Sequence, residues 1–308
     1  MIPTFGRAIE VRRCIESIHE AARSTGESFE IIVSASGYQP TELVEIQKGV
    51  TELIASTERL PFGVARNRGA SQASGELLFF LDDDNVIDAY CIKRLAECLT
   101  ERRAIAMVGP LMYYGSDPDR LWCAGVMRSR ILGRTRKVTR VPDPLPELLP
   151  SLDFPNCFMV RRSDFIAVGG FDEELLPAHF GESDLAARFR EAGLGVAACV
   201  ASARVWHFIE PGLTRYLSLH DPEWAYQIGR GRAIFAARHG DSFEWLAYLL
   251  AGQFLYTAFY VGPGLLGFAG PRRAQMIKAY LRGVVDGLRT GVKVRGDRNR
   301  LAQPMSSK

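Results

Sequence analysis

The sequence lacks the signatures of several protein classes. Its six cysteines form no CxxC pair, which argues against a zinc site and fits reduced thiols in a cytosol. The net charge is only +3, which by itself is too small to indicate a nucleic-acid partner, and we expect none. The N-terminus has no basic segment followed by an apolar run, so we expect no signal peptide.

Internal repeats and low-complexity segments are also missing from the sequence. No glycine-rich phosphate loop with a lysine lies near the N-terminus, which argues against a nucleotidyltransferase that activates sugars. The chain has 308 residues, of which 47% are hydrophobic and 24% charged. These values are typical of a globular protein with one large α/β domain and an appendage.

A short apolar run followed by three acids is the most informative stretch. Residues 77–81 (LLFFL) are too few for a typical helix and predict a strand buried on both faces, as in a parallel sheet. Asp82, Asp83 and Asp84 follow directly, at the strand end where α/β sheets bind ligands. Adjacent carboxylates repel, so a divalent cation bound with substrate phosphates suits them. The alternative is an acidic turn that caps the next helix, a role that Asp88 also fits.

Strands and helices alternate before this run. The expected elements are a helix over 9–22 ended by Gly26, a strand over 29–33, a helix over 41–47, a strand over 51–55 and a helix around 65–73. This alternation predicts an α/β fold with a mainly parallel sheet and right-handed crossovers.

Five ordered stretches carry a family resemblance: IPTFGR at 2–7, GVARNRGASQASGELLFFLDDD at 63–84, GGFDEELL at 169–176, GESDLAARFREAGLGV at 181–196, and the Trp206-His207 pair. With them the chain resembles inverting glycosyltransferases of family 2, of the rhamnosyltransferase-like type. Ordered matches over roughly 200 residues are far more specific than any one motif. The resemblance implies the GT-A (Rossmann-like) fold, with a mainly parallel sheet flanked by helices.

The resemblance also implies an activity and its site. The activity is metal-dependent hexosyl transfer, with inversion, from a nucleotide-diphosphate sugar to an acceptor hydroxyl on a glycan or lipid-linked acceptor, in cell-surface polysaccharide or glycolipid assembly. Mg²⁺ or Mn²⁺ would be held by Asp82, Asp84 and His207. Glu182 would be the catalytic base with Asp184 next in line, and the donor would contact Pro3, Thr4, Arg66, Asp82 and Asp83.

The residues alone leave alternatives for this second set. Glu182 and Asp184 lie at the start of a predicted helix, where acids commonly act as caps and where the helix dipole favours their charged form. A carboxylate at an active-site rim can instead accept the proton of an acceptor hydroxyl. His207 follows a predicted strand over 197–205 and fits a structural histidine as well as a metal ligand. Asp82 and Asp84 are expected to be solvated at the strand end, so that Asp82→Ala or Asp84→Ala would abolish metal-dependent turnover and leave the fold intact.

The sequence departs from the family pattern in two places. Only Met1 and Ile2 precede the Pro-Thr pair, so we expect either a truncated first strand or a start codon placed late, with the missing strand encoded upstream in frame. Ala35 and Ser36 stand where the family has adjacent aspartates that hold the nucleotide base. The identity of the base therefore stays open. These departures favour one alternative function, a catalytically silent membrane scaffold or partner subunit.

A basic stretch lies in the middle of the chain: Arg128, Arg130, Arg134, Arg136, Lys137 and Arg140. It predicts a solvated loop or a site for a phosphate-bearing acceptor such as a lipid diphosphate. Residues 142–150 carry four prolines and continue neither a helix nor a central strand.

The C-terminal third has a different composition. We expect a glycosyltransferase domain at 1–210 and a helical region at 211–308, with a basic helix over 224–240. Residues 245–271 run 27 positions without a charge, broken by glycine and proline, and ten basic residues against two acidic ones follow. A single crossing would oppose the positive-inside rule. Peripheral or re-entrant attachment at the cytoplasmic face of the cell membrane is therefore favoured over a transmembrane span.

Overall fold

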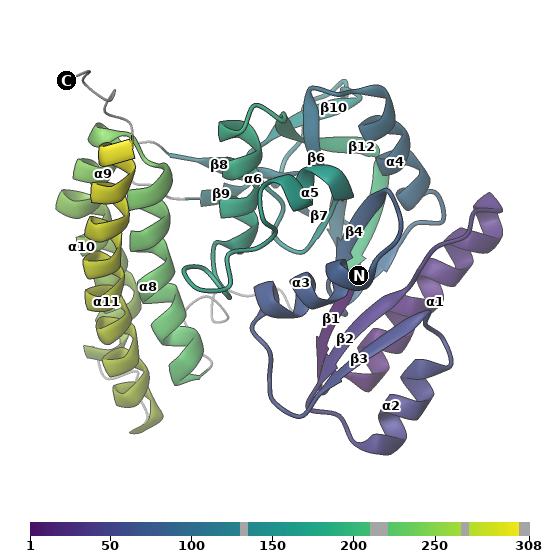
Figure 1. Ribbon diagram of the computed structural model, residues 1–308, viewed down its shortest axis with the longest axis horizontal. Coiled ribbons are helices and arrows are strands. Elements are labelled where there is room, and N and C mark those ends of the chain that lie inside the picture. Colours follow the sequence, from purple (N-terminus) through teal and green to yellow (C-terminus); the bar gives the residue numbers. More distant parts are fainter. Residues whose placement is uncertain (130–134, 210–220, 266–270, 302–308) are drawn as a thin grey trace, which may run out of the picture. The chain divides into compact units, whose positions relative to one another are not determined.

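The computed structural model describes residues 1–129, 135–209, 221–265 and 271–301 (Figure 1). The chain forms two compact units. The first comprises 1–127, 136–173 and 181–211, and the second comprises 128–135, 174–180 and 212–308. Each unit is described separately.

The first unit begins with three parallel strands in the order β1-β2-β3: β1 (Ile2–Phe5), β2 (Ile32–Ser36) and β3 (Glu52–Ser56). The helices between and after them are α1 (Ala8–Thr25), α2 (Pro40–Gln47) and α3 (Phe62–Gln72). Gly26 ends α1 in the left-handed conformation, with φ of 69°, as its sequence position predicts. The strand expected at 29–33 lies instead at Ile32–Ser36, because its register is set by pairing with β1, which places Val33 opposite Ile2.

The predicted central strand is β4 (Leu77–Leu81), with Leu78, Phe80 and Leu81 buried. Backbone hydrogen bonds join it to the N-terminus: Met1 N donates to Phe79 O at 2.8 Å, and Leu81 N donates to Met1 O at 3.1 Å. On its other side β4 pairs antiparallel with β11 (Cys157–Arg161). The strand is therefore buried between two neighbours, which positions the residues that follow it.

The remaining strands extend the β4 sheet in the order β10-β12-β6-β11-β4. Of these pairs only β6–β12 is parallel, so the α/β prediction is confirmed but the sheet is mixed. The other strands of this sheet are β5 (Asn85–Ile87), β6 (Ile105–Tyr114), β7 (Asp117–Cys123), β10 (Leu148–Ser151) and β12 (Val196–His207). A separate two-stranded sheet consists of β8 (Val126–Arg128) and β9 (Thr135–Lys137). The helices are α4 (Cys91–Glu101), α5 (Arg162–Ala167) and α6 (Gly181–Glu191).

The basic stretch is partly used within the fold. Lys137 Nζ lies 3.7 Å from the centre of the Trp122 ring, and Arg128 pairs with Glu244 at 3.0 Å. Arg130 and Arg134 lie outside the described residues. A phosphate-binding role for this stretch remains a prediction.

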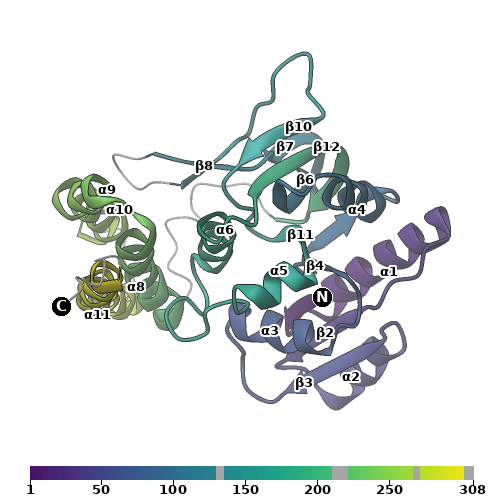
Figure 2. The ribbon, with the colours of Figure 1, turned by 45° about the horizontal axis from the view of Figure 1, so that its top comes forward.

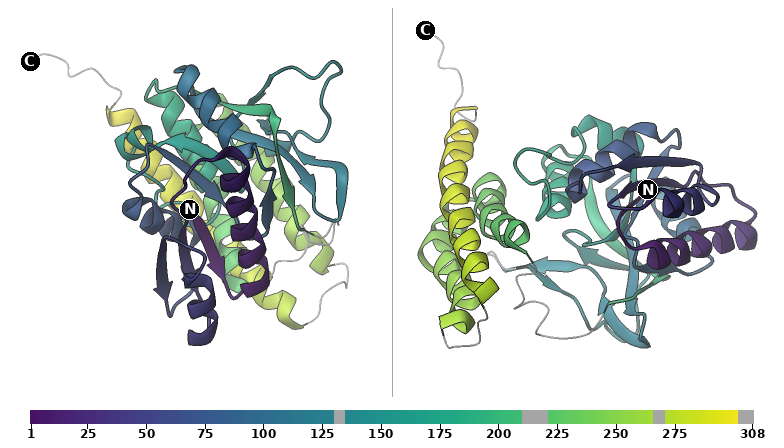
Figure 3. Two further views of the ribbon diagram at one scale, coloured as in Figure 1. Left: turned by 90° about the vertical axis from the view of Figure 1, so that its right-hand side faces the viewer. Right: turned by 90° about the horizontal axis from the view of Figure 1, so that it is seen from below.

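The second unit is helical: α8 (Pro222–His239), α9 (Ser242–Ala247), the π-helix η1 (Tyr248–Gly252), α10 (Gln253–Leu265) and α11 (Pro271–Leu301). Figures 2 and 3 show α11 running alongside α8. Glycines let these backbones approach: a Cβ at Gly229 would lie 2.4 Å from Tyr280 O, and one at Gly283 would lie 2.1 Å from Tyr226 O. None of the helices in the described residues is long and apolar enough to cross a membrane.

Candidate active site

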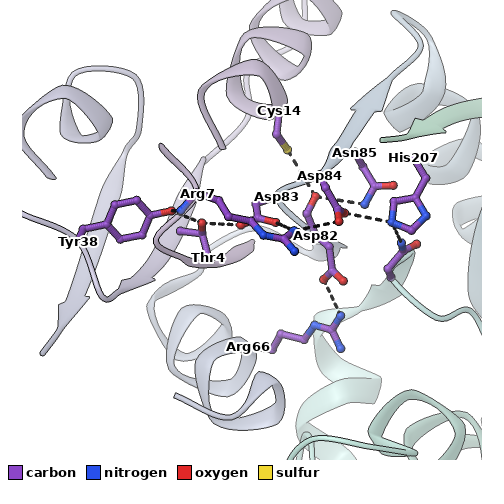
Figure 4. Close-up of polar contacts among 11 residues, drawn as sticks. Thr4, Arg7, Cys14, Tyr38, Arg66, Asp82, Asp83, Asp84, Asn85 and His207 are labelled. Atoms are coloured by element: carbon purple, nitrogen blue, oxygen red, sulfur yellow. Dashed lines mark hydrogen bonds and ion pairs between the residues drawn. The ribbon is translucent and has the colours of Figure 1, made fainter. Parts of the chain in front are cut away.

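Of the three aspartates in the turn after β4 (Figure 4), Asp83 and Asp84 are buried and Asp82 is partly exposed. Asp84 is only 8% exposed and Asp83 is also buried. The turn is fixed by the backbone, because Asp82 N donates to Asn156 O at 3.0 Å and Asn85 N donates to Asp82 O at 3.2 Å. The expectation of a solvated carboxylate is therefore wrong for Asp84, whereas the side chain of Asp82 keeps 21% of its surface exposed. Each aspartate instead has partners that other elements supply.

Arg66, from α3, joins the first aspartate to the predicted base. Its guanidinium is 2% exposed and donates to Asp82 Oδ1 at 2.8 Å and to Glu182 Oε1 at 2.5 Å. Burial alone would lower the pKa of Arg66, but the two carboxylates raise it above its usual value, so the side chain stays charged. Arg66 and Glu182, which are 116 positions apart in the sequence, are thereby held together.

The pKa of Asp82 is shifted strongly upward. Burial raises it to about 7 although Arg66 opposes this shift, and the charges of Asp84, Glu182 and Asp83 add to it. The charged cluster is therefore costly in the absence of an added cation.

Asp83 points to the strand that begins the chain. Its Oδ2 accepts a hydrogen bond from Thr4 Oγ1 at 2.6 Å, and its Oδ1 lies 3.1 Å from the Arg7 guanidinium. Tyr38 completes this group, since its hydroxyl contacts Thr4 Oγ1 and accepts from Arg7 N at 2.9 Å. Burial raises the pKa of Asp83 to about 6, against the lowering effects of Thr4 and Arg7. Pro3 lies in β1 opposite Ser34.

Asp84 points the other way, to the end of β12. His207 Nε2 is 3.2 Å from Asp84 Oδ1 and also 3.2 Å from Asn156 Nδ2. Burial would raise the pKa of Asp84, but His207 and Arg7, which lies 3.0 Å from Oδ2, lower it below its usual value. Within the described residues, Asp84 Oδ1, Asn156 Oδ1 and His207 Nδ1 are buried without a hydrogen bond of good geometry.

These residues were tested for their fit to a divalent cation. The described residues contain no group of three or more His, Cys, Asp or Glu side chains arranged to hold a metal ion. However, ligand atoms ~2.1 Å from an octahedral ion lie about 3.0 Å apart in adjacent positions. Asp84 Oδ1 and His207 Nε2, at 3.2 Å, fit that spacing, and the buried Asn156 amide lies beside them. Asp82 lies on Arg66 and is not part of this pair.

Charge supports the same fit. Among the described residues, the carboxylates of Asp82, Asp83, Asp84 and Glu182 form ion pairs with two guanidinium groups, those of Arg7 and Arg66. With all four carboxylates ionised, two negative charges are left over, which a divalent cation would offset.

The two carboxylates of α6 differ in their surroundings. Glu182 reaches Arg66 in the aspartate cluster, whereas Asp184 is fully buried and accepts from Arg188 Nε at 2.7 Å. Arg188 also donates to Val168 O and Gly170 O, so Asp184 belongs to the bonds that hold α6 to the preceding loop. Phe180, directly before α6, has φ of 66°, a backbone conformation uncommon for a bulky residue and frequent at functional sites.

A family model matches residues 1–169 of this chain, and its description is glycosyl transferase family 2. The chain belongs to that family. The match covers β1, the three aspartates and the strand pair β4–β11, and ends before Glu182. The resemblance drawn from the motifs is confirmed at the level of the family.

Solved structures of glycosyltransferases share the fold of this family 2 glycosyltransferase. S. aureus TarS 1-349 in complex with UDP-GlcNAc is 15% identical, with a TM-score of 0.57, over 97% of this chain and 90% of that one. The mannosyltransferase PcManGT from Pyrobaculum calidifontis, in complex with GDP-Man and Mn²⁺, is 14% identical, with a TM-score of 0.53, over 98% and 86%.

A third similar structure is GalNAc-T7 with UDP, GalNAc and Mn²⁺. It is 15% identical, with a TM-score of 0.56, over 84% of this chain, which spans 57% of the GalNAc-T7 chain. At these identities the similarity shows the fold alone. No curated protein matches the sequence.

Three residues of this glycosyltransferase's site were missed from the sequence. Arg7 stands inside the IPTFGR motif, so its signal was present but unused. Tyr38 follows β2 and Asn156 precedes β11, and neither carries a local sequence signal. Only the pairing of β4 with β11 brings Asn156 to the aspartates.

Proposed function

We propose that this glycosyltransferase moves a sugar from a nucleotide-diphosphate donor to an acceptor hydroxyl with inversion, aided by Mg²⁺ or Mn²⁺. The observation that supports this most is the Arg66 bridge. It holds the carboxylate of Glu182 next to Asp82. Glu182 therefore lies beside the cluster of aspartates that would bind the donor diphosphate through the cation.

In the proposed reaction Glu182 accepts the proton of the acceptor hydroxyl. The hydroxyl oxygen forms a bond to the anomeric carbon on the face opposite the diphosphate, and the bond from that carbon to the diphosphate oxygen breaks. One displacement inverts the anomeric configuration. Arg66 holds the Glu182 carboxylate by an ion pair and orients it from α3.

Asp84 and His207 are the proposed protein ligands of the cation, with Asn156 as a third. Turning the Asn156 amide would direct its oxygen, which has no hydrogen-bond partner among the described residues, to the place now held by its nitrogen. When bound, the cation neutralises charge on the departing diphosphate. Thr4, Arg7 and Asp83 would line the donor side.

Donor and acceptor are assigned only by class. A glycan or lipid-linked acceptor, a role in cell-surface polysaccharide or glycolipid assembly and the rhamnosyltransferase-like subtype are supported by the motifs alone. Titration with UDP, GDP and dTDP in the presence of Mn²⁺ tests the donor site and identifies the base. If none of the three binds, the catalytically silent scaffold becomes the better account.

The metal ligands can be tested without turnover. We expect His207→Ala to weaken Mn²⁺ binding by at least about 10–100-fold. That is the loss usually seen when a residue that only hydrogen-bonds a metal ligand is removed, so loss of a ligand should cost at least as much. The free Mn²⁺ signal in electron paramagnetic resonance measures this directly. His19→Ala is the matched control, because His19 contacts Gly49 O in another part of the unit, and it should bind Mn²⁺ as wild type does.

Asn156 gives a sharper test of the same site. Asn156→Ala should weaken Mn²⁺ binding, whereas Asn156→Asp should preserve or strengthen it, because a carboxylate oxygen replaces the amide oxygen. If Asn156→Asp loses Mn²⁺ as Asn156→Ala does, the amide acts only as a donor to His207 and is not a ligand.

A further inference from the structure

The segment α9–η1–α10 exposes an apolar face along its whole described length. Leu250 is 74% exposed and Phe254 is 72% exposed, values unusual for such large apolar side chains. The other members of this face are Phe243, Leu246, Leu249, Leu255 and Phe259. Many of them recur three or four positions apart, so they gather on one side of the segment.

The opposite side of this segment is already covered. Tyr248 and Gly252 are buried, and the rings of Tyr260 and Tyr280 lie 5.0 Å apart, which packs α10 against α11. The exposed residues are therefore not part of the packed helical core of this unit.

Helix α11 continues the apolar face. Leu281, Val285 and Val292 are exposed at spacings of four and seven residues. Leu288 lies between Val285 and Val292 on the same side of the helix and packs against the buried cluster that includes Tyr248. The exposed stripe of α11 therefore borders the line along which α11 meets the α9–η1–α10 segment.

Cations line the far border of this stripe. Lys278, Arg289 and Lys293 are exposed, and Lys278 and Arg289 each lie three positions before a stripe residue. The described residues place no carboxylate within ion-pair distance of these three, while Arg282 faces Asp286 at 3.9 Å. Residues 271–301 hold nine basic residues and two acidic ones.

We propose that this apolar face, with its border of Lys278, Arg289 and Lys293, binds the surface of an anionic lipid bilayer. The segment α9–η1–α10 would lie in the interface plane with its large apolar side chains inserted, and the cations would contact the headgroups. This is the peripheral attachment that the composition of 245–271 predicts. It does not depend on the proposed sugar transfer.

Charge favours a bilayer over a second copy of this chain. Pairing two of these surfaces brings cations toward cations, with few carboxylates to balance them. An anionic headgroup layer balances every one of them, and each adjacent Lys or Arg strengthens binding about fivefold.

The test uses the full chain and a reporter at the centre of the face. All six native cysteines are buried, so Leu250→Cys can be labelled with an environment-sensitive dye. Val44→Cys, on the exposed side of α2, is the matched control. Vesicles of phosphatidylcholine alone and of equal parts phosphatidylcholine and phosphatidylglycerol are added to each, and binding is also measured by co-sedimentation.

We expect the dye at 250, and not at 44, to shift to the blue with the anionic vesicles, and salt to weaken binding. Phe254→Glu should abolish co-sedimentation while Val44→Glu leaves it unchanged. Lys278→Glu, Arg289→Glu and Lys293→Glu combined should lower it at least a hundredfold, since each cation contributes about fivefold.

Three outcomes overturn the proposal. One is a protein that binds neither vesicle. The second is a protein that light scattering shows to be a dimer without lipid and that Phe254→Glu converts to a monomer, which would assign the face to a second copy. Binding that survives Phe254→Glu would likewise exclude insertion of the apolar face.

Discussion

Replacing Glu182 with glutamine is expected to lower kcat by about 10²–10⁴-fold while the Kd for the donor stays unchanged. The amide keeps the shape of the side chain but cannot accept the proton of the acceptor hydroxyl. It can still contact Arg66, so the donor side of the site should keep its geometry. Steady-state kinetics with saturating donor, together with donor titration, separates the two effects.

Glu20→Gln is the control for this substitution, because Glu20 is an exposed carboxylate that pairs only with neighbours on α1. It should leave both kcat and Kd at the wild-type values. An unchanged kcat in Glu182→Gln would remove Glu182 from its role as base. Asp184 is a poor substitute, since its carboxylate is fully buried against Arg188.

Arg66→Met is expected to destabilise the first unit by roughly 3–5 kcal/mol, because it leaves two poorly solvated carboxylates without their shared cation. Asp82 and Glu182 are both mostly shielded from water and both depend on this one guanidinium. Urea unfolding of wild type and variant at the same pH measures the difference in the free energy of unfolding.

Two further variants identify the cause of that loss. Arg23→Met removes an exposed arginine that pairs with Glu20 and should change the free energy of unfolding by less than about 0.5 kcal/mol. Adding Asp82→Asn to Arg66→Met removes one of the unpaired charges and should restore part of the stability. If Arg66→Met unfolds at the same urea concentration as wild type, the Arg66 bridge does not contribute to the free energy of unfolding.

Local sequence signals were sufficient for the first three helices and for the central strand. Gly26 ends α1 where its backbone freedom is needed, and the apolar run of β4 lies where its length and flanking residues place it. The acids after that strand were found because the carboxyl ends of parallel strands are where α/β sheets bind ligands. Strand β4 has such a neighbour in β1, since it hydrogen-bonds Met1, which directly precedes that strand.

Long-range pairing was beyond the reach of the same signals. The apolar sequence of β4 is equally compatible with a parallel and an antiparallel neighbour, so β11 was not predicted as its partner. The burial of Asp83 and Asp84 follows from Thr4 in β1, Arg7 at the start of α1 and His207 in β12. The spacing of residues in the sequence does not predict that these distant segments meet at the aspartates.

Turnover of nucleotide sugars is the most direct test of the account. The protein is incubated with a panel of nucleotide-diphosphate sugars, with Mn²⁺ or with a chelator, and the released nucleoside diphosphate and the anomeric configuration of the sugar product are measured. We predict that at least one donor is turned over only with the metal, that the product has the opposite anomeric configuration, and that Glu182→Gln is inactive. A panel in which no donor reacts, or in which release is the same with the chelator and in Glu182→Gln, would contradict it.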